Sequence, residues 1–425
     1  MSMVILVLAV SAVALLLIGL PIAYALSAAG VFTLLAEGGT PLLVFPQRFF
    51  NAINSFSLMA IIFFVIAGEL MMQGGISQRI VNFAQLFLGR VRGSLSFINF
   101  ICCAFFGAIS GSALATAAAI GGILYPEMIK DDDYDPNYAA AMIGVGGTLG
   151  LMIPPSITLI LYGTLTDSSV GALFLAIVVP GIIVTLAYCV CSYLVIRKKG
   201  YATHRQDHSN INVGKAILEA IPALLTPVII LGGIYGGVFT PTESAIVASI
   251  YAILVGIFVY RELTWARFVT AMKNSAVTSS VIMFLIGSAS FFGWVMTNLK
   301  IPAMVSTAMM SICSSKLMFL LIVNVLFLIC GMLMETSTIV LLVVPLVFPV
   351  AQSFGVNPIH FGVITCTNLA MGMYTPPFGA NIFLTAGMGR LKVASVFKAA
   401  MPLILTGILC VLLITYVPFL STMFL

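Results

Sequence analysis

Apolar segments recur along the whole chain of 425 residues, and most reach the length of about 20 residues that a helix needs to cross a membrane. In the first half these segments lie at 3–36, 56–72, 94–125, 138–163 and 170–196. In the second half they lie at 219–238, 242–259, 277–297, 301–312, 317–351, 359–388 and 400–424. One long polar stretch, Arg197–Lys215, separates the halves. The pattern predicts an all-α polytopic membrane protein built from two similar halves.

Small polar or Gly-Pro breaks interrupt two apolar segments in each half. Ser110-Gly-Ser112 and Glu335-Thr-Ser337 divide segments that are too long for half a membrane, so we expect a re-entrant helical hairpin at each. Gly147–Ser156 and Gly372–Gly379 each contain a Pro-Pro pair, which removes two backbone donors and stops the preceding helix. Matched interruptions in two halves indicate the binding site of a transporter. We therefore expect two inverted repeats, each with one hairpin and one broken helix.

The chemistry of the breaks favours a cation and an organic anion together. Freed carbonyls in an unwound helix suit a small cation, and restarted helix N-termini suit an anion. Arg390 is the basic residue nearest to either Pro-Pro pair, more than ten residues away, so an anion there would need bound cations. This favours cation-coupled symport. The side chains that we expect to meet the substrate are Ser112, Ser156, Thr158, Thr336, Ser337 and Asn381.

Two amphipathic stretches predict helices that lie in the membrane surface. In 75–93 apolar residues follow helical spacing, with Gln78, Arg79, Asn82, Gln85 and Arg92 on the opposite face. A similar pattern covers 261–275, so we expect one such arm helix per half; ordinary loop-flanking helices are the alternative. Met1–Leu20 lacks a basic start and an A-x-A cleavage site, so we expect it to be a retained span.

Composition restricts the class of protein. The chain is 61% hydrophobic and 7% charged, where a soluble domain has about 25% charged residues. The excess of Lys and Arg in the connector predicts that it is cytoplasmic. An odd number of crossings per inverted repeat then puts both termini outside. The eight cysteines lie almost entirely in apolar segments and lack metal or redox spacing, and three histidines are too few for a metal centre.

The acidic residues leave two interpretations open. Glu69, Glu243 and Glu335 lie within or at the start of apolar segments, where carboxylates are functional candidates, yet each can equally cap a helix or pair internally. Asp131–Asp135 is interpreted as a solvated loop, with Asp135 as the N-cap before Pro136.

Five motifs resemble one transporter family. Gly107–Gly121, Tyr134–Met142, Gly150–Ser156, Pro180-Gly181 and Tyr374–Asn381 are similar to the large membrane subunit (DctM-like) of TRAP transporters, in the wider ion-transporter superfamily. The resemblance covers almost the whole chain. It implies a bacterial inner-membrane subunit that pairs with a separate small four-helix membrane subunit and takes an organic acid anion from a periplasmic binding protein. The implied substrates are C4-dicarboxylates, sialic acid and similar acids. Transport would be driven by Na⁺, without an organic cofactor, by an elevator motion.

The same resemblance implies two sodium sites. The residues that match the first site are Ser110, Ser112, Gly147, Met152 and Pro154. Those that match the second are Gly331, Thr336, Gly372, Thr375 and Pro377. Several of these would bind through main-chain carbonyls.

We therefore predict a scaffold formed by 1–93 and 216–316, a transport domain formed by 94–196 and 317–425, and a connector over 197–215. An enzyme is not expected, because a Ser-Lys, paired-Asp or His-metal arrangement on facing helices is missing from the sequence. A nucleic-acid partner is not expected either; the bilayer is the surrounding medium. A stand-alone divalent-anion/sodium symporter without a binding protein is the nearest alternative. A passive channel is a further alternative, but two closed hairpins suit an occluding carrier better.

Overall fold

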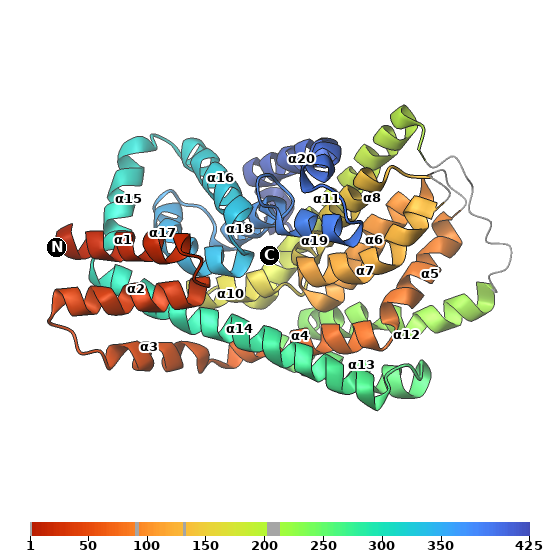
Figure 1. The fold of residues 1–425 in the computed structure, drawn as a ribbon, viewed down its shortest axis with the longest axis horizontal. Helices are drawn as coiled ribbons and strands as arrows, with labels where there is room; N and C mark the ends of the chain where they lie inside the picture. The colour runs from red at the N-terminus through yellow and green to blue at the C-terminus, as the bar shows by residue number, and fades with distance from the viewer. Residues whose placement is uncertain (1, 90–92, 131–132, 202–212) are drawn as a thin grey trace.

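A computed structural model describes residues 2–89, 93–130, 133–201 and 213–425, and within these ranges the chain is helical with no strand (Figure 1). Nine helices in the described part are long and apolar enough to cross a membrane. Four features that the sequence singled out lie outside the described residues: Arg92, Asp131 with Asp132, the two histidines His204 and His208, and the connector over 202–212.

The first half forms helices α1 to α11. Their bounds are α1 Ser2–Leu17, α2 Ile22–Glu37, α3 Val44–Ile53, α4 Phe56–Gln73, α5 Ile76–Leu88, α6 Ser94–Ser110, α7 Ala113–Ile129, α8 Pro136–Gly147, α9 Leu149–Met152, α10 Ile157–Thr166 and α11 Val170–Lys199. The second half comprises α12 Val213–Tyr235, α13 Pro241–Leu254 with a π-helical extension η2 Val255–Val259, α14 Trp265–Asn298, α15 Ile301–Ile312, α16 Lys316–Leu333, α17 Thr336–Ser353, α18 Pro358–Gly372, α19 Ala380–Met388, α20 Val393–Tyr416 and α21 Phe419–Thr422.

The predicted breaks are confirmed as helix ends. α6 stops at Ser110 and α7 starts at Ala113, while α16 stops at Leu333 and α17 starts at Thr336. The two Pro-Pro segments fall between α9 and α10 and between α18 and α19. Asp135 caps α8 as expected, since its carboxylate accepts a hydrogen bond from the backbone N–H of Tyr138 at 3.0 Å.

The order of helices repeats along the chain at the Pro-Pro interval, which is the separation in sequence between Pro154 and Pro376. Shifted by this interval, α4 falls on 278–295 within α14, and α10 falls on 379–388, which α19 occupies. Contacts repeat too: α2 packs against α14, and α13 packs against α4. Ser27 and Ser249 are equivalent positions in these pairs. Ser27 Oγ contacts Ser288 Oγ at 2.9 Å, and Ser249 Oγ donates to the Phe63 carbonyl at 2.9 Å.

The arm helices differ from the prediction. An amphipathic helix at 261–275 and a separate span at 277–297 were expected, but α14 is one continuous helix of 34 residues. No proline interrupts it, so the backbone hydrogen bonds continue through both parts. By the Pro-Pro interval, the partner of its first part is α3, an amphipathic helix that the sequence interpretation missed, and the partner of α5 is α15.

The two halves interlock around the broken helices. α8 of the first half packs against α19 and α20 of the second half, and α11 packs against α18 and α20. Figure 1 shows α14 running along the lower side of the molecule, from the region of α13 towards α15. This arrangement brings breaks that are far apart in the sequence to the centre of the protein.

Candidate substrate and cation site

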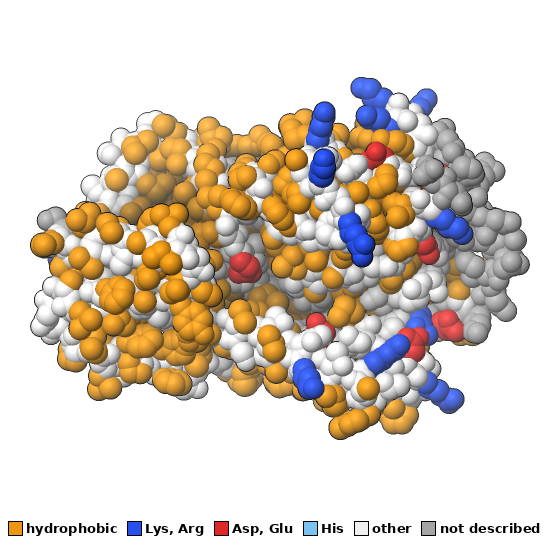
Figure 2. All heavy atoms as spheres, viewed as in Figure 1, with side chains coloured by type: hydrophobic (Ala, Val, Ile, Leu, Met, Phe, Trp, Pro, Cys, Tyr) orange, Lys and Arg blue, Asp and Glu red, His pale blue; other side chains and the backbone are white. Residues whose placement is uncertain are grey.

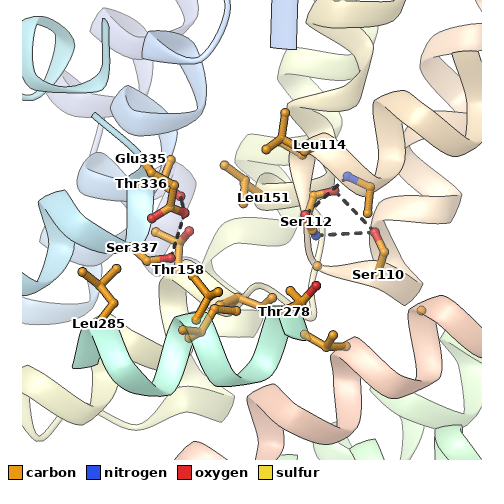
Figure 3. Close-up of a pocket in the computed structure, with 18 of the residues that line it drawn as sticks. Ser110, Ser112, Leu114, Leu151, Thr158, Thr278, Leu285, Glu335, Thr336 and Ser337 are labelled. Atoms are coloured by element: carbon orange, nitrogen blue, oxygen red, sulfur yellow. Dashed lines mark hydrogen bonds between the residues drawn. The ribbon is translucent and has the colours of Figure 1, made fainter. Parts of the chain in front are cut away.

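A cavity of about 1220 Å³ lies at the centre, and the tips of both hairpins face it (Figure 3). Ser110–Ala115 contribute the first tip, and Glu335–Thr338 contribute the second. The broken helices add Leu151, Thr158 and Met373, among others. Most of the remaining wall comes from α4 and α14, including Glu69, Thr278 and Leu285, and from the start of α2 at Pro21–Tyr24. Two tips from opposite halves of the sequence therefore share one cavity.

The first tip is built on a left-handed glycine. Gly111 ends α6 with φ +62°, a conformation that favours glycine. Ser112 then caps α7 by accepting a hydrogen bond from Ala115 N–H at 3.4 Å, and Ser110 Oγ lies 3.0 Å from Thr116 Oγ1. A Cβ at Gly111 would lie 2.8 Å from the Pro155 carbonyl oxygen, so this tip rests directly on the first Pro-Pro segment.

The second tip is organised by a carboxylate. Glu335 caps α17, because one of its oxygens accepts from Thr338 N–H at 3.2 Å. Its other oxygen accepts from the hydroxyls of Thr336 at 3.2 Å and Ser337 at 2.9 Å. The capping interpretation of Glu335 is confirmed, and the carboxylate also lines the cavity. Both hydroxyl oxygens keep lone pairs for a further ligand.

Each hairpin meets its broken helix through a pair of glycines. A Cβ at Gly107 would lie 2.7 Å from Gly150 Cα, and a Cβ at Gly331 would lie 3.0 Å from Gly372 Cα. The sequence interpretation placed Gly147 in the first sodium site and named Gly150 only as the start of a family motif. Gly150 could have been recognised from the sequence as the equivalent of Gly372, because the two glycines are separated by the Pro-Pro interval. These close approaches leave backbone carbonyls, such as that of Ser112, beside the unwound segment.

Most of the remaining predicted residues are buried behind the tips, whereas Pro377 is exposed. Of the predicted set, Ser110, Ser112, Thr158, Thr336 and Ser337 line the cavity. Those that do not are Gly147, Met152, Pro154, Ser156, Gly331, Gly372, Thr375, Pro377 and Asn381. Ser156 is fully buried, with its hydroxyl 3.8 Å from the Cys366 sulfur.

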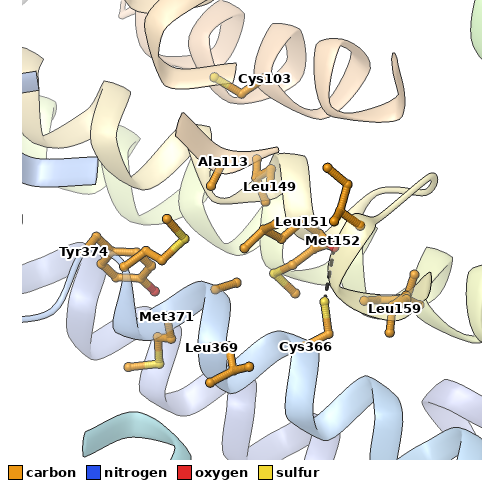
Figure 4. Close-up of a cluster of buried hydrophobic side chains, with 14 of the residues drawn as sticks. Cys103, Ala113, Leu149, Leu151, Met152, Leu159, Cys366, Leu369, Met371 and Tyr374 are labelled. Carbon is orange, nitrogen blue, oxygen red and sulfur yellow. Dashed lines mark hydrogen bonds between the residues drawn. The ribbon is translucent and has the colours of Figure 1, made fainter. Parts of the chain in front are cut away.

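The broken helices of the two halves pack against each other. Around Leu149–Met152 and α18 lies a cluster of buried apolar side chains, in which the Cys366 thiol donates to the Leu151 carbonyl at 3.2 Å (Figure 4). The Asn381 side-chain amide donates to the Gly144 carbonyl at 2.9 Å, which ties the second broken helix to the first. Both Pro-Pro peptide bonds are cis.

Two buried oxygens at the site lack a partner among the described residues. The Thr158 hydroxyl lines the cavity and the Asn381 side-chain carbonyl lies behind it, and neither has a hydrogen bond there. Buried polar atoms are normally paired, so such atoms are available to a ligand. The Thr375 hydroxyl is buried as well and donates to the Met371 carbonyl at 2.7 Å, which leaves its lone pairs free.

Among the described residues, the cavity wall contains two carboxylates, Glu69 and Glu335. It contains neither Lys nor Arg in this part of the chain. Glu69 accepts a hydrogen bond from the Asn274 amide at 3.2 Å. Glu243 lies elsewhere and forms a capping box with Thr240 at the start of α13, which confirms its structural role. Within the described residues, no group of three His, Cys, Asp or Glu could hold a metal. The oxygen donors that the site offers to a cation are therefore main-chain carbonyls, hydroxyls and the two separate carboxylates of Glu69 and Glu335.

Paired hairpin tips and paired broken helices around one cavity are the arrangement expected of a polytopic helical membrane transporter. The family model for the DctM component of the tripartite ATP-independent periplasmic (TRAP) transporters matches residues 9–420. The chain belongs to this family, and the resemblance drawn from its five motifs is confirmed.

Relatives with named substrates cover most of the chain. An isethionate TRAP permease from Oleidesulfovibrio alaskensis is 39% identical over 95% of this chain, which spans 63% of that longer protein. The sialic acid large permease SiaM of Vibrio cholerae is 35% identical, covering 95% of this chain and 94% of its own length. The C4-dicarboxylate large permease DctM of the same species is 36% identical, with coverages of 96% and 95%.

A solved structure supports the fold. The crystal structure of the YdaH transporter of Alcanivorax borkumensis aligns with a TM-score of 0.63 at 16% identity. The alignment covers 91% of this chain and 89% of that one. The likeness concerns the arrangement of helices and carries no information on substrate.

Proposed function

We propose that this chain is the large membrane subunit of a sodium-coupled tripartite transporter that imports an organic acid anion. The observation that carries the proposal is the shared cavity: two hydroxyl-bearing tips, docked on two unwound helices, with no basic side chain among the described residues of the wall. The named relatives transport isethionate, sialic acid and C4-dicarboxylates, all of which are organic acid anions.

The charge of the cavity wall supports sodium coupling. An anion between Glu69 and Glu335 is repelled unless positive charge enters with it, because attraction and repulsion are strong where water is scarce. Hard oxygen donors suit Na⁺, and the site offers main-chain carbonyls and the hydroxyls of Ser110, Ser112, Thr336 and Thr375. Binding Na⁺ at the tips would supply the positive charge that the described wall does not place there.

The substrate carboxylate would lie between the two tips. The unpaired Thr158 hydroxyl can donate to it, and Thr158 is in the first turn of α10, where backbone N–H groups also favour negative charge. Ser337 and Ser112 face the same space from opposite sides (Figure 3). Ser156 and Asn381 would act by supporting the unwound segments, since both are fully buried away from the cavity.

Movement would take place along the contact between the hairpins and the wall formed by α4 and α14. Gly68 of α4 faces the first tip, and a Cβ there would lie 3.2 Å from Ser110 Cα. A contact without a side chain at Gly68 suits an elevator motion. In this motion the transport domain, 94–196 and 317–425, would slide against the scaffold. Both hairpins end at the central cavity, which suits re-entrant elements of inverted repeats.

Basic residues support the proposed orientation. On the face in Figure 2, Lys and Arg side chains gather over the half of the molecule that contains α5 and the end of α11. α11 ends with Arg197–Lys199, the first residues of the predicted connector. Positive residues favour the cytoplasmic side. We therefore place this end in the cytoplasm of a bacterium and the chain in its inner membrane.

The tripartite assembly is tested by leaving out one component at a time. Vesicles containing this chain, its small membrane subunit and the binding protein should take up labelled isethionate, sialic acid or a C4-dicarboxylate under an inward sodium gradient. Leaving out either partner should reduce uptake to the level of empty vesicles. Full uptake by this chain alone would contradict the tripartite proposal and favour the stand-alone symporter.

A further inference from the structure

We propose that Tyr188 is a positioning residue that joins the two sodium sites, an inference that rests on the proposed function. Tyr188 lies on α11, in the transport domain but outside both hairpins and both broken helices. Its hydroxyl is 2.5 Å from the hydroxyl of Tyr374. Tyr374 immediately precedes Thr375 in the second unwound segment. The contact therefore holds the backbone at the position where the second sodium ion would bind.

The pair is fully enclosed. The exposed fractions are 2% for Tyr188 and 1% for Tyr374. Their rings meet edge to face, with centroids 6.3 Å apart and an angle of 86°. Gly407 of α20 provides the space, since a Cβ there would lie 3.0 Å from the Tyr188 hydroxyl. A buried hydroxyl that loses its partner is costly, so the pair fixes one conformation of the segment that follows Gly372.

The other side of Tyr188 contacts the first hairpin. Its ring packs against Phe100 of α6, with centroids 5.6 Å apart. α6 ends in the Ser110 tip, which carries ligands of the predicted first sodium site. One side chain thus touches the hairpin of the first site and the unwound segment of the second. A shift of α6 on binding the first ion would change the position of Tyr374 through this contact.

The equivalent positions of the other repeat do not carry a second tyrosine pair. One Pro-Pro interval after Tyr188 the chain has Cys410, and one interval before Tyr374 it has Met152. Neither is able to form a hydroxyl pair of this kind. The first unwound segment instead packs closely against α11 at Gly181. A Cβ at Gly181 would lie 2.8 Å from the Met152 carbonyl oxygen. The hydroxyl contact is therefore a feature of the second repeat.

Removing either hydroxyl should weaken sodium binding. Tyr188→Phe and Tyr374→Phe each retain the ring and delete one hydrogen-bonding group. We expect the half-saturating sodium concentration to rise by about threefold to tenfold in each variant, the range that one such bond supports. The Hill coefficient for sodium should fall towards one. Because both changes break the same bond, the double variant should be no weaker than either single variant.

The measurement uses sodium as its probe, so no substrate needs to be known. The chain is purified with its small subunit, and the midpoint of thermal unfolding is followed as NaCl replaces KCl at constant ionic strength. An ion that binds the folded state raises the midpoint by mass action. Tyr162→Phe is the matched control: Tyr162 is also fully buried, and its hydroxyl donates to the Pro358 carbonyl at 2.7 Å, away from both Pro-Pro segments.

Each outcome bears on one claim. Higher half-saturation in both tyrosine variants, no further loss in the double variant, and a wild-type response in Tyr162→Phe would support the role of Tyr188. Wild-type sodium response in Tyr188→Phe and Tyr374→Phe, or independent losses that add in the double variant, would overturn it. A wild-type protein that responds equally to NaCl and KCl would instead contradict the proposed sodium coupling.

Discussion

Replacing Gly372 by alanine is expected to reduce uptake to background. The added Cβ would lie 2.5 Å from the carbonyl carbon and Cα of Gly331. These are backbone atoms and cannot rotate away, so the second hairpin must separate from the unwound helix. Overpacking of this kind costs about 1–3 kcal/mol of stability, and here it acts directly on the site. Uptake under a sodium gradient measures the effect.

Gly387→Ala is the control for this variant. Gly387 lies one helix further along, on α19, and a Cβ there would meet nothing within 4 Å. Alanine also favours the helix by roughly 1 kcal/mol relative to glycine. Gly387→Ala should therefore transport like the wild type. Normal uptake by Gly372→Ala would show that the hairpin does not need to dock on the second unwound segment.

Thr375→Val is expected to raise the half-saturating sodium concentration by about tenfold or more. The substitution keeps the shape of the side chain and removes its hydroxyl, which is buried and keeps lone pairs free for a cation. Changes to the surroundings of a metal ligand alone cost about 10- to 100-fold in affinity, so loss of a ligand should reach at least that range. Uptake measured against sodium concentration gives the result.

A second threonine from the helix that precedes this segment provides the control. Thr367 is also buried and donates to the carbonyl four residues before it, Val363, at 2.9 Å, as Thr375 does to Met371. Thr367→Val removes the same groups within regular helix. Its sodium dependence should match that of the wild type. An equal loss of sodium affinity in both variants would assign the effect to helix stability and remove Thr375 from the site.

The breaks were predictable because each has a local cause. Single prolines lie inside several helices, such as Pro180 in α11, but a Pro-Pro pair removes two adjacent donors and a Ser-Gly-Ser tip favours a turn. Ser110–Ser112 and the Pro-Pro segments could therefore be placed from the sequence to within a few residues. The cap at Asp135 has a local signature too, and it was also correct. The family could be named for the same reason, since its motifs coincide with these interruptions.

Features that depend on packing could not be predicted in the same way. The continuous α14 joins a polar and an apolar stretch, and periodicity alone does not show where one helix ends and another begins. α3 was missed because its aromatic residues are explained by tertiary contacts. Phe45 packs against Phe291 of α14, and Phe49 packs against Phe284 of the same helix. The Tyr188–Tyr374 contact joins residues 186 positions apart, which no local pattern records.

The predicted site divides in a similar way. Residues at the tips, such as Ser112 and Ser337, do face the cavity, because a tip has few other neighbours. Ser156 and Asn381 were expected to meet the substrate from the restarted helices, yet both are buried in contacts between the halves. Direction of a side chain around a helix start depends on the packing of the whole domain. The sequence placed these residues near the site without showing which way they point.

The most direct test of sodium coupling is uptake of the labelled anion into vesicles containing the assembled transporter, with sodium present outside, on both sides or on neither. The proton gradient is dissipated and potassium replaces sodium. The two proposed cation sites, beside a cavity whose described wall lacks Lys and Arg, predict accumulation only when an inward sodium gradient is present. Accumulation at the full rate with sodium absent from both sides would contradict the account.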